Sequence, residues 1–131
     1  MQDHVRAGLA CVVFNSLGDR KDYRINDGSN TFHFGGYVTA SSLRLSVNHS
    51  SYPPLEMSGS PKRIFYEYDK EGDDQEPVKG ELICEISSDQ TSFNGTDTAT
   101  RQSFTGEIDM DTLEIEITDY EDSSTTTYRF N

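Results

Sequence analysis

The chain has no tryptophan, two cysteines and four prolines, and it is poor in basic residues. Its 131 residues include 11 Lys or Arg against 23 Asp or Glu, which gives a formal net charge of −12 at pH 7. So few basic residues cannot form the positive surface that binds a nucleic-acid backbone or an anionic membrane. The composition therefore predicts neither a nucleic-acid partner nor a membrane partner.

A long hydrophobic run is also absent. The longest apolar run, residues 7–14, is far too short to cross a bilayer. A secretory signal is not indicated, because Arg6 is the only basic residue before this run and no small-residue cleavage site follows it. We interpret residues 8–17 as the first core strand. The expected location is cytoplasmic, and the mature form of a secreted protein is the alternative.

The two cysteines, Cys11 and Cys84, both fall in predicted strands. Buried free thiols are the favoured interpretation. The alternative is a disulfide, which requires adjacent strands and an oxidising compartment. No C-x-x-C spacing occurs, so neither a zinc site nor a redox motif is indicated.

The acidic residues are unevenly distributed along the chain. Residues 1–68 contain six acidic and seven basic side chains, whereas residues 69–131 contain seventeen acidic and four basic ones. Such asymmetry predicts an acidic surface in the second half that attracts cations or a basic protein. Small basic clusters at residues 20–24 and 62–63 offer a docking site for the acidic half of a second copy, so a homo-oligomer is a further expectation.

Short β-prone runs alternate with turn-forming clusters. No helix is predicted, because apolar residues rarely recur at three-to-four spacing over ten or more positions. Seven Tyr and seven Phe supply enough apolar surface for a small core and argue against disorder. Residues 50–61 are predicted to be a loop because they contain three prolines and Gly59. The pattern predicts one all-β domain spanning residues 1–131, a meander-rich antiparallel barrel of about eight strands. A two-sheet β-sandwich is the alternative. In strand count the prediction resembles small ligand-binding barrels of the lipocalin type, without the Trp of their G-x-W signature.

The last thirty residues predict a three-stranded meander. A four-residue loop at 109–112 puts Gly106 opposite Ile115, and a second loop at 120–123 puts Ile115 opposite Tyr128. These two registers place nearly every apolar side chain on one face, as a half-buried antiparallel sheet requires.

The opposite face of this meander is predicted to be acidic. The same registers put Glu107 opposite Glu114, with Arg129 on the other side of Glu114 as an internal counter-charge. One functional hypothesis is therefore an interaction module that binds a basic partner. Its candidate residues are Glu107, Asp109, Asp111, Glu114 and Glu116.

A different hypothesis, which we favour, is a non-catalytic module that holds a small apolar or aromatic ligand in the barrel mouth. The pair Gly35-Gly36 interrupts a predicted strand, which is typical of a barrel bend or of a close approach to a ligand. Aromatic residues that flank this bend or lie on a later strand are candidates for the lining. The predicted ligand-binding residues are His33, Phe34, Tyr37, Tyr66 and Tyr68.

The third hypothesis is a small cofactor-independent enzyme that uses His33 with a carboxylate. Little in the sequence favours catalysis, because the three histidines are dispersed and no nucleophile motif is present. No cofactor and no metal site are predicted. The acidic segment 69–76 is interpreted as a solvated connection, with a site for a hard cation as the alternative.

Overall fold

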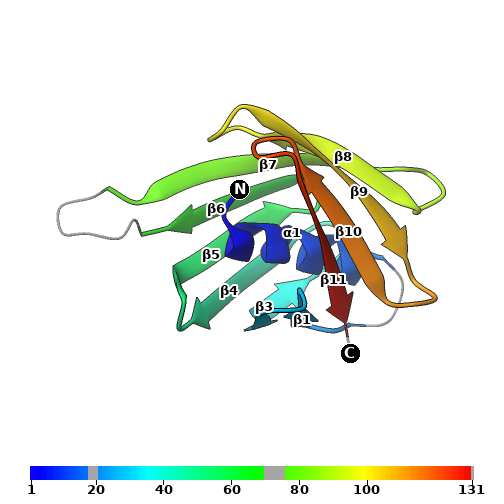
Figure 1. Ribbon diagram of the computed structural model, residues 1–131, viewed down its shortest axis with the longest axis horizontal. Coiled ribbons are helices and arrows are strands. Elements are labelled where there is room, and N and C mark those ends of the chain that lie inside the picture. The colour runs from blue at the N-terminus through cyan, green and yellow to red at the C-terminus, as the bar shows by residue number, and fades with distance from the viewer. Residues whose placement is uncertain (18–20, 70–75, 131) are drawn as a thin grey trace.

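The computed structural model describes residues 1–17, 21–69 and 76–130. It contains one antiparallel sheet of eleven strands, which curls nearly into a barrel around a single helix (Figure 1). The helix is α1 (Asp3–Ser16). The strands are β1 (Arg24–Asn26), β2 (Thr31–His33), β3 (Gly35–Val38), β4 (Leu43–His49), β5 (Tyr52–Ser60), β6 (Arg63–Tyr68), β7 (Val78–Ile86), β8 (Ser92–Asp97), β9 (Gln102–Asp109), β10 (Glu114–Asp119) and β11 (Ser124–Phe130). The barrel prediction is confirmed, with eleven strands in place of about eight.

Helix α1 occupies the interior of the barrel, so the strand predicted at residues 8–17 is wrong, and so is the prediction that the chain forms no helix. Every residue from His4 to Asn15 is buried. The middle of the helix, residues 7–14, is apolar on every side and therefore has no amphipathic period. A short apolar run of this kind looks the same in the sequence whether it forms a strand or a helix. Burial on every side is possible here because the sheet surrounds the helix. Within the described residues, no helix is long and apolar enough to span a membrane.

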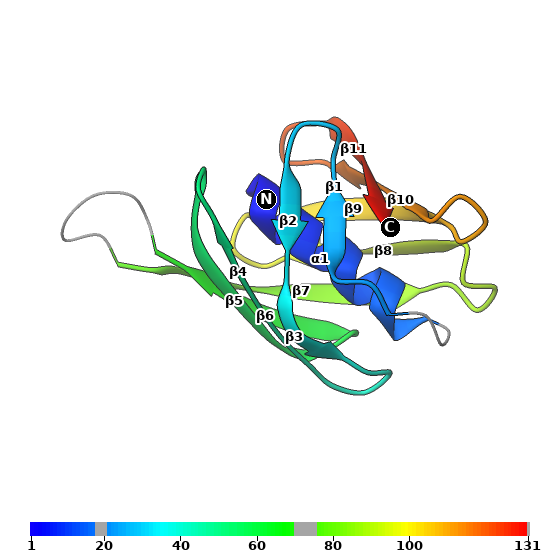
Figure 2. The ribbon, with the colours of Figure 1, turned by 90° about the horizontal axis from the view of Figure 1, so that it is seen from below.

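The two edges of the sheet are connected by the chain itself. The edge strands are β2, which pairs with β1, and β3, which pairs with β4. Only Phe34 separates β2 from β3 in the chain. Figure 2 shows β2 and β3 following one another across the barrel. The Gly35-Gly36 pair lies where the chain joins β4. A Cβ on Gly36, whose φ is +114°, would lie 1.9 Å from the Arg44 carbonyl oxygen, so only glycine allows this approach.

The predicted loop at residues 50–61 is wrong, because most of it forms β5. Pro53 and Pro54 precede the regular pairing of β5 with β6, which starts at Leu55. On the other side, an irregularity in β4 between Val47 and His49 leaves both prolines outside the ladder. The missing N–H groups therefore cost no sheet hydrogen bond, which is the condition under which a strand accepts proline.

The C-terminal meander is confirmed, with one register corrected. Tyr128 lies opposite Ile115 as predicted, but Ile115 lies opposite Ile108 and not opposite Gly106. The first hairpin loop is residues 110–113 and not 109–112, with Leu113 in the left-handed region at φ 58°. Moving the loop by one residue changes the pairing by two, so the same side chains still face the core.

Pairs of an aromatic residue and a glycine shape the inner face of the sheet. Phe93 lies opposite Gly106, and Phe104 lies opposite Gly95. A Cβ on Gly106 would lie 2.0 Å from the Phe93 ring. The glycines therefore let large rings lie flat on the neighbouring strand, which leaves space for α1.

Both cysteines are buried and free, as favoured from the sequence. Cys11 lies in α1 and not in a strand, whereas Cys84 lies in β7 as predicted. Burial raises the pKa of both thiols, that of Cys84 to about 12, so neither is a reactive thiolate at neutral pH.

Candidate functional site

The five predicted ligand residues do not converge on one site. Phe34 and Tyr66 are buried on the inner face of the barrel, whereas His33 and Tyr37 are exposed on the outside. Tyr68 is half-buried at the end of β6 and stacks on Tyr66, with ring centroids 6.2 Å apart. The alternation of a strand explains the division, since neighbouring side chains point to opposite faces.

The barrel interior is occupied by α1. A Cβ added to Gly8, in the middle of the helix, would lie 2.4 Å from Met57 Sδ. Near the other end of the helix, the Phe14 and Phe130 rings stack with centroids 3.9 Å apart. Helix and sheet therefore pack in direct contact, and a ligand has to be sought at the ends of the barrel or on its outer surface.

A hollow of about 370 Å³ lies at the end of the barrel where α1 begins. We call it the mouth hollow. Its walls come from the residue before α1, the start of β5, the end of β6 and the start of β7. The lining residues are Gln2, Ser51, Tyr52, Pro53, Tyr68, Asp69 and Val78. Two tyrosine rings, a proline and a valine make this lining apolar enough to hold an organic molecule.

His4 contacts the two tyrosines of the mouth hollow from the barrel interior. Its ring stacks on Tyr52 at 5.2 Å and meets Tyr68 edge-on at 4.8 Å between centroids. The side chain is fully buried, and neither ring nitrogen has a hydrogen-bond partner among the described residues. Burial lowers the pKa of His4 to about 4, so the ring is neutral at pH 7.

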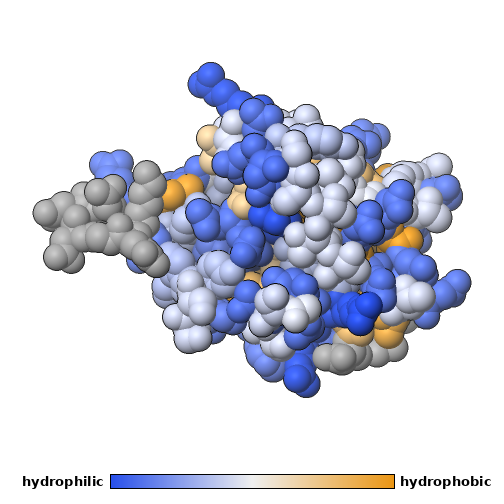
Figure 3. All heavy atoms as spheres, viewed as in Figure 1, coloured by the Kyte–Doolittle hydropathy of each residue, from blue (hydrophilic) through white to orange (hydrophobic). Residues whose placement is uncertain are grey.

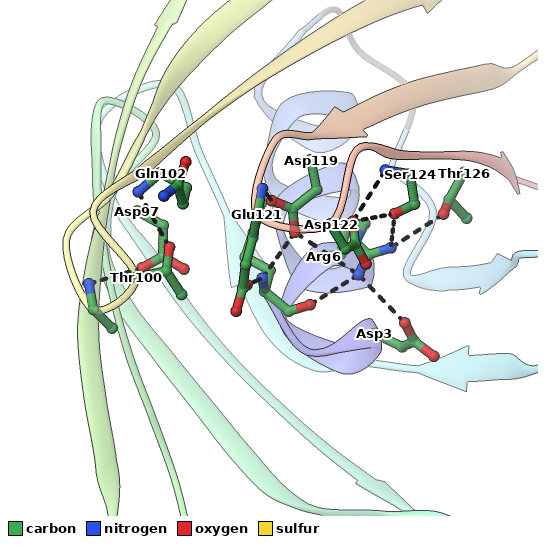
Figure 4. A network of polar contacts seen from close by, with 12 residues as sticks. Asp3, Arg6, Asp97, Thr100, Gln102, Asp119, Glu121, Asp122, Ser124 and Thr126 are labelled. Carbon is green, nitrogen blue, oxygen red and sulfur yellow. Dashed lines mark hydrogen bonds and ion pairs between the residues drawn. The ribbon is translucent and has the colours of Figure 1, made fainter.

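A polar network next to the mouth hollow holds the start of α1 against the β10–β11 turn (Figure 4). The Arg6 guanidinium is 4% exposed and donates to the Met1 carbonyl at 2.8 Å and to Thr126 Oγ1 at 3.2 Å. It also forms an ion pair with Asp119 at 3.8 Å. The Met1 amino group contacts Asp119 Oδ2 at 2.8 Å and the carboxylate of Glu121. Paired in this way, the buried charges fix the position of the helix end.

Asp97 is a buried carboxylate that the sequence did not indicate, because it stands in an ordinary polar stretch. It is 1% exposed, and its Oδ1 accepts a hydrogen bond from the Tyr66 hydroxyl at 2.8 Å. Its Oδ2 has no partner among the described residues. Burial and this hydrogen bond raise the pKa of Tyr66. The pair extends the polar surroundings of Tyr68, which stacks on Tyr66.

Four of the five predicted acidic residues do come together. Glu107, Asp109, Glu114 and Glu116 line a hollow of about 460 Å³ on the outer side of β9 and β10. We call this surface the acidic face. Figure 3 shows that hydrophilic side chains cover most of the molecular surface on the side it draws.

Pairing within the acidic face differs in part from the prediction. Glu107 lies opposite Glu116, and Glu114 lies opposite Asp109. Arg129 lies opposite Glu114 as predicted, with Nε 3.2 Å from Oε1. Asp111 lies apart at the hairpin tip, where its backbone N–H donates to Asp109 Oδ1 at 3.0 Å. Of the two directly opposed pairs of carboxylates, the Glu114–Asp109 pair therefore has a basic neighbour in Arg129.

Two further candidates from the sequence are the His33 side chain and the acidic segment 69–76. His33 is exposed and its neighbour on β1 is Arg24, not a carboxylate. Most of the acidic segment 69–76 lies outside the described residues. Among the residues that the structure does describe, no group of three or more His, Cys, Asp or Glu side chains could hold a metal ion.

The fold and the site together define a class, an antiparallel barrel filled by its own N-terminal helix, with an aromatic hollow at one end. No protein-family model matches the chain, and comparisons with curated proteins and with solved structures found no significant match.

Proposed function

We propose that the protein is a non-catalytic binding module that holds a small ligand with an apolar or aromatic body in the mouth hollow. The observation that carries the proposal is the pair of half-buried tyrosines, Tyr52 and Tyr68, which line a hollow of about 370 Å³. That volume falls in the range of small-molecule sites, roughly 300–1,000 Å³. The proposal therefore keeps the barrel mouth expected from the sequence, with a lining that shares only Tyr68 with the residues predicted there.

Two features of the surroundings support this site. Tyr52 is fixed, because its hydroxyl donates to Asp3 Oδ2 at 2.7 Å and its ring stacks on His4. Tyr68 is fixed on its other side by stacking on Tyr66. Aromatic walls that are held in place before binding lose little conformational entropy when a ligand arrives.

Indole is a suitable probe, and its binding is measured by isothermal titration calorimetry. We expect saturable binding to the native chain and a decrease of about fivefold to tenfold in affinity for Tyr68→Leu, because a stacking surface is lost. Tyr37→Leu is the matched control, since Tyr37 is 49% exposed and does not line the mouth hollow. Saturable binding that Tyr68→Leu leaves unchanged would exclude the mouth hollow as the site.

The acidic face supports a second candidate function, an interaction with a basic protein. Its supporting observation is the hollow lined by Glu107, Asp109, Glu114 and Glu116, in which Arg129 is the one basic side chain that contacts a member of the set, among the described residues. A basic segment that enters this hollow would relieve the repulsion between the opposed carboxylates.

Binding of an oligolysine peptide, followed by fluorescence anisotropy at increasing salt, tests this candidate. We expect an affinity that decreases steeply with salt and that decreases further in Glu107→Gln/Glu116→Gln. Binding that is equally strong in the double variant would exclude the acidic face as the docking surface.

A further inference from the structure

Carboxylates surround the mouth hollow. Asp69 is exposed and lines the hollow directly, and Asp3 accepts the hydroxyl proton of Tyr52 at 2.7 Å. Burial raises the pKa of the Tyr68 hydroxyl, and the negative charges of Asp97 and Glu121 raise it further. Both carboxylates therefore lie close enough to act on Tyr68. A group in the hollow is therefore exposed to negative potential from several directions.

Positive groups in the same region are already neutralised. The Met1 amino group and the Arg6 guanidinium are both buried, and both form ion pairs with Asp119. Arg6 also lies 3.4 Å from Asp3 Oδ1. Neither cation lines the hollow. Within the described residues, the carboxylates near the hollow outnumber these two cations, so the local charge is negative.

The buried histidine adds no positive charge. The ring of His4 is neutral at pH 7, because burial lowers its pKa to about 4. It stacks on Tyr52, so the ring behind this part of the hollow's wall is uncharged.

The tyrosine rings are suited to a cation for a further reason. The faces of aromatic rings carry partial negative charge and attract ammonium groups. The hydrogen bond from the Tyr52 hydroxyl to the Asp3 carboxylate shifts electron density toward the ring and strengthens that attraction. On the Tyr66 side of Tyr68, Asp97 is 1% exposed, and its Oδ2 has no hydrogen-bond partner in the part of the chain that the structure describes.

From this arrangement we infer that the mouth hollow selects an organic cation, a small ammonium compound whose charged group is received between Tyr52 and Tyr68 and faces Asp69. The inference rests on the proposed function, because it names the ligand class of the same site. Methyl groups on the nitrogen suit the hollow best, since they contact the rings while the positive charge is retained.

Choline and 3,3-dimethylbutan-1-ol are the probes, because the two molecules have the same shape and differ in charge. We expect calorimetry to show choline binding about tenfold more tightly, with an affinity that falls as salt is raised. Equal or tighter binding of the alcohol, lost in Tyr68→Leu, would overturn the cation inference and leave the proposed function standing. If neither probe nor indole binds saturably, both are overturned.

A single charge deletion locates the effect. Asp69→Asn is expected to weaken choline by about threefold and to leave 3,3-dimethylbutan-1-ol unchanged. Glu85→Gln is the matched control, because Glu85 is exposed on β7 opposite Asn94 and does not line the hollow. An equal effect of both variants on choline would show that only the net charge of the protein matters, which would overturn the inference. Thermal unfolding of each variant confirms that the fold is intact.

Discussion

His4 combines complete burial with two ring nitrogens that have no partner among the described residues. Such a group lowers stability unless its surroundings compensate, and here they do so through the rings of Tyr52 and Tyr68. The titratable groups that act on it are Asp3, which favours the charged form, and His49, which opposes it. Burial exceeds both and keeps the ring neutral.

This lowered pKa predicts acid sensitivity. The unfolded chain takes up the His4 proton near pH 6.5, whereas the folded chain takes it up near pH 4. The contribution of neutral His4 to stability is therefore complete above pH 6.5 and is lost as the pH falls toward 4, by about 3 kcal/mol at most. Urea denaturation at pH 7 and pH 4.5 measures this loss.

His4→Phe provides the comparison, because a phenyl ring fits between the same tyrosines and does not titrate. The variant is expected to lose less stability than the native chain between the two pH values. An identical decrease in both chains would show that other groups cause the acid sensitivity.

At the scale of the elements, the inner face of the sheet is adjusted to accommodate a helix. Glycines occur where an aromatic ring from the neighbouring strand crosses, as in the Phe93–Gly106 pair. The ring covers the backbone of the opposite strand, and this keeps the layer between sheet and helix thin. The same arrangement relates Tyr66 to Gly80, where an added Cβ would lie 2.4 Å from the tyrosine ring.

Gly106→Ala is expected to destabilise the protein by about 2–3 kcal/mol, because its Cβ overlaps a Phe93 ring that is 2% exposed and has little room to move. Chemical denaturation measures the change. Gly35→Ala is the control, since its nearest neighbouring atom lies at 3.7 Å. Adding Phe93→Leu to Gly106→Ala should recover part of the loss. The explanation would be contradicted if the double variant lost as much free energy of unfolding as the two single variants lose together.

At the scale of the whole molecule, the net charge of −12 opposes folding through self-repulsion. The antiparallel pairing concentrates part of that repulsion on the acidic face, where Glu107 lies opposite Glu116. The ion pair between Arg129 and Glu114 compensates for part of it. Stability is therefore expected to depend on ionic strength.

Glu116→Gln is expected to stabilise the protein by about 0.2–1 kcal/mol at low salt, because one of two opposed carboxylates is removed. The gain should shrink in high salt as screening increases. Thermal denaturation at two salt concentrations measures both effects. Glu85→Gln is the control, since its neighbour across the strand is Asn94 and not an acid. An equal gain in both variants would assign the effect to net charge and not to the opposed pair.

Much of the fold was predictable from the alternation of apolar and polar residues along the strands. The β10–β11 register was predicted from a four-residue loop that put Ile115 opposite Tyr128, with both side chains on the buried side. The same alternation explains why His33, although predicted as a ligand residue, is exposed between the buried Phe32 and Phe34. The acidic face was also predictable, since its residues occupy the other side of the same strands.

The candidate site was predictable only in part. Of the five predicted ligand residues, Tyr68 alone lines the mouth hollow. Tyr52 was assigned to a loop because two prolines follow it, and His4 gave no signal beyond its place before an apolar run. Their partners lie far away in the sequence, as in the contact between His4 and Tyr68. Contacts of that length depend on the closed barrel and not on any local pattern.

The sequence by itself determined the antiparallel sheet, its inner and outer faces and its acidity, because these follow from the period of two and from composition. The tertiary structure decided that residues 3–16 form a helix and not a strand. An apolar run can satisfy its backbone hydrogen bonds as a helix or as a strand. Inside the barrel, none of the described strands is free to pair with this run, so the helix is the form that satisfies them. By filling that interior, the helix leaves the mouth hollow as the place where Tyr52, Tyr68 and Asp69 meet.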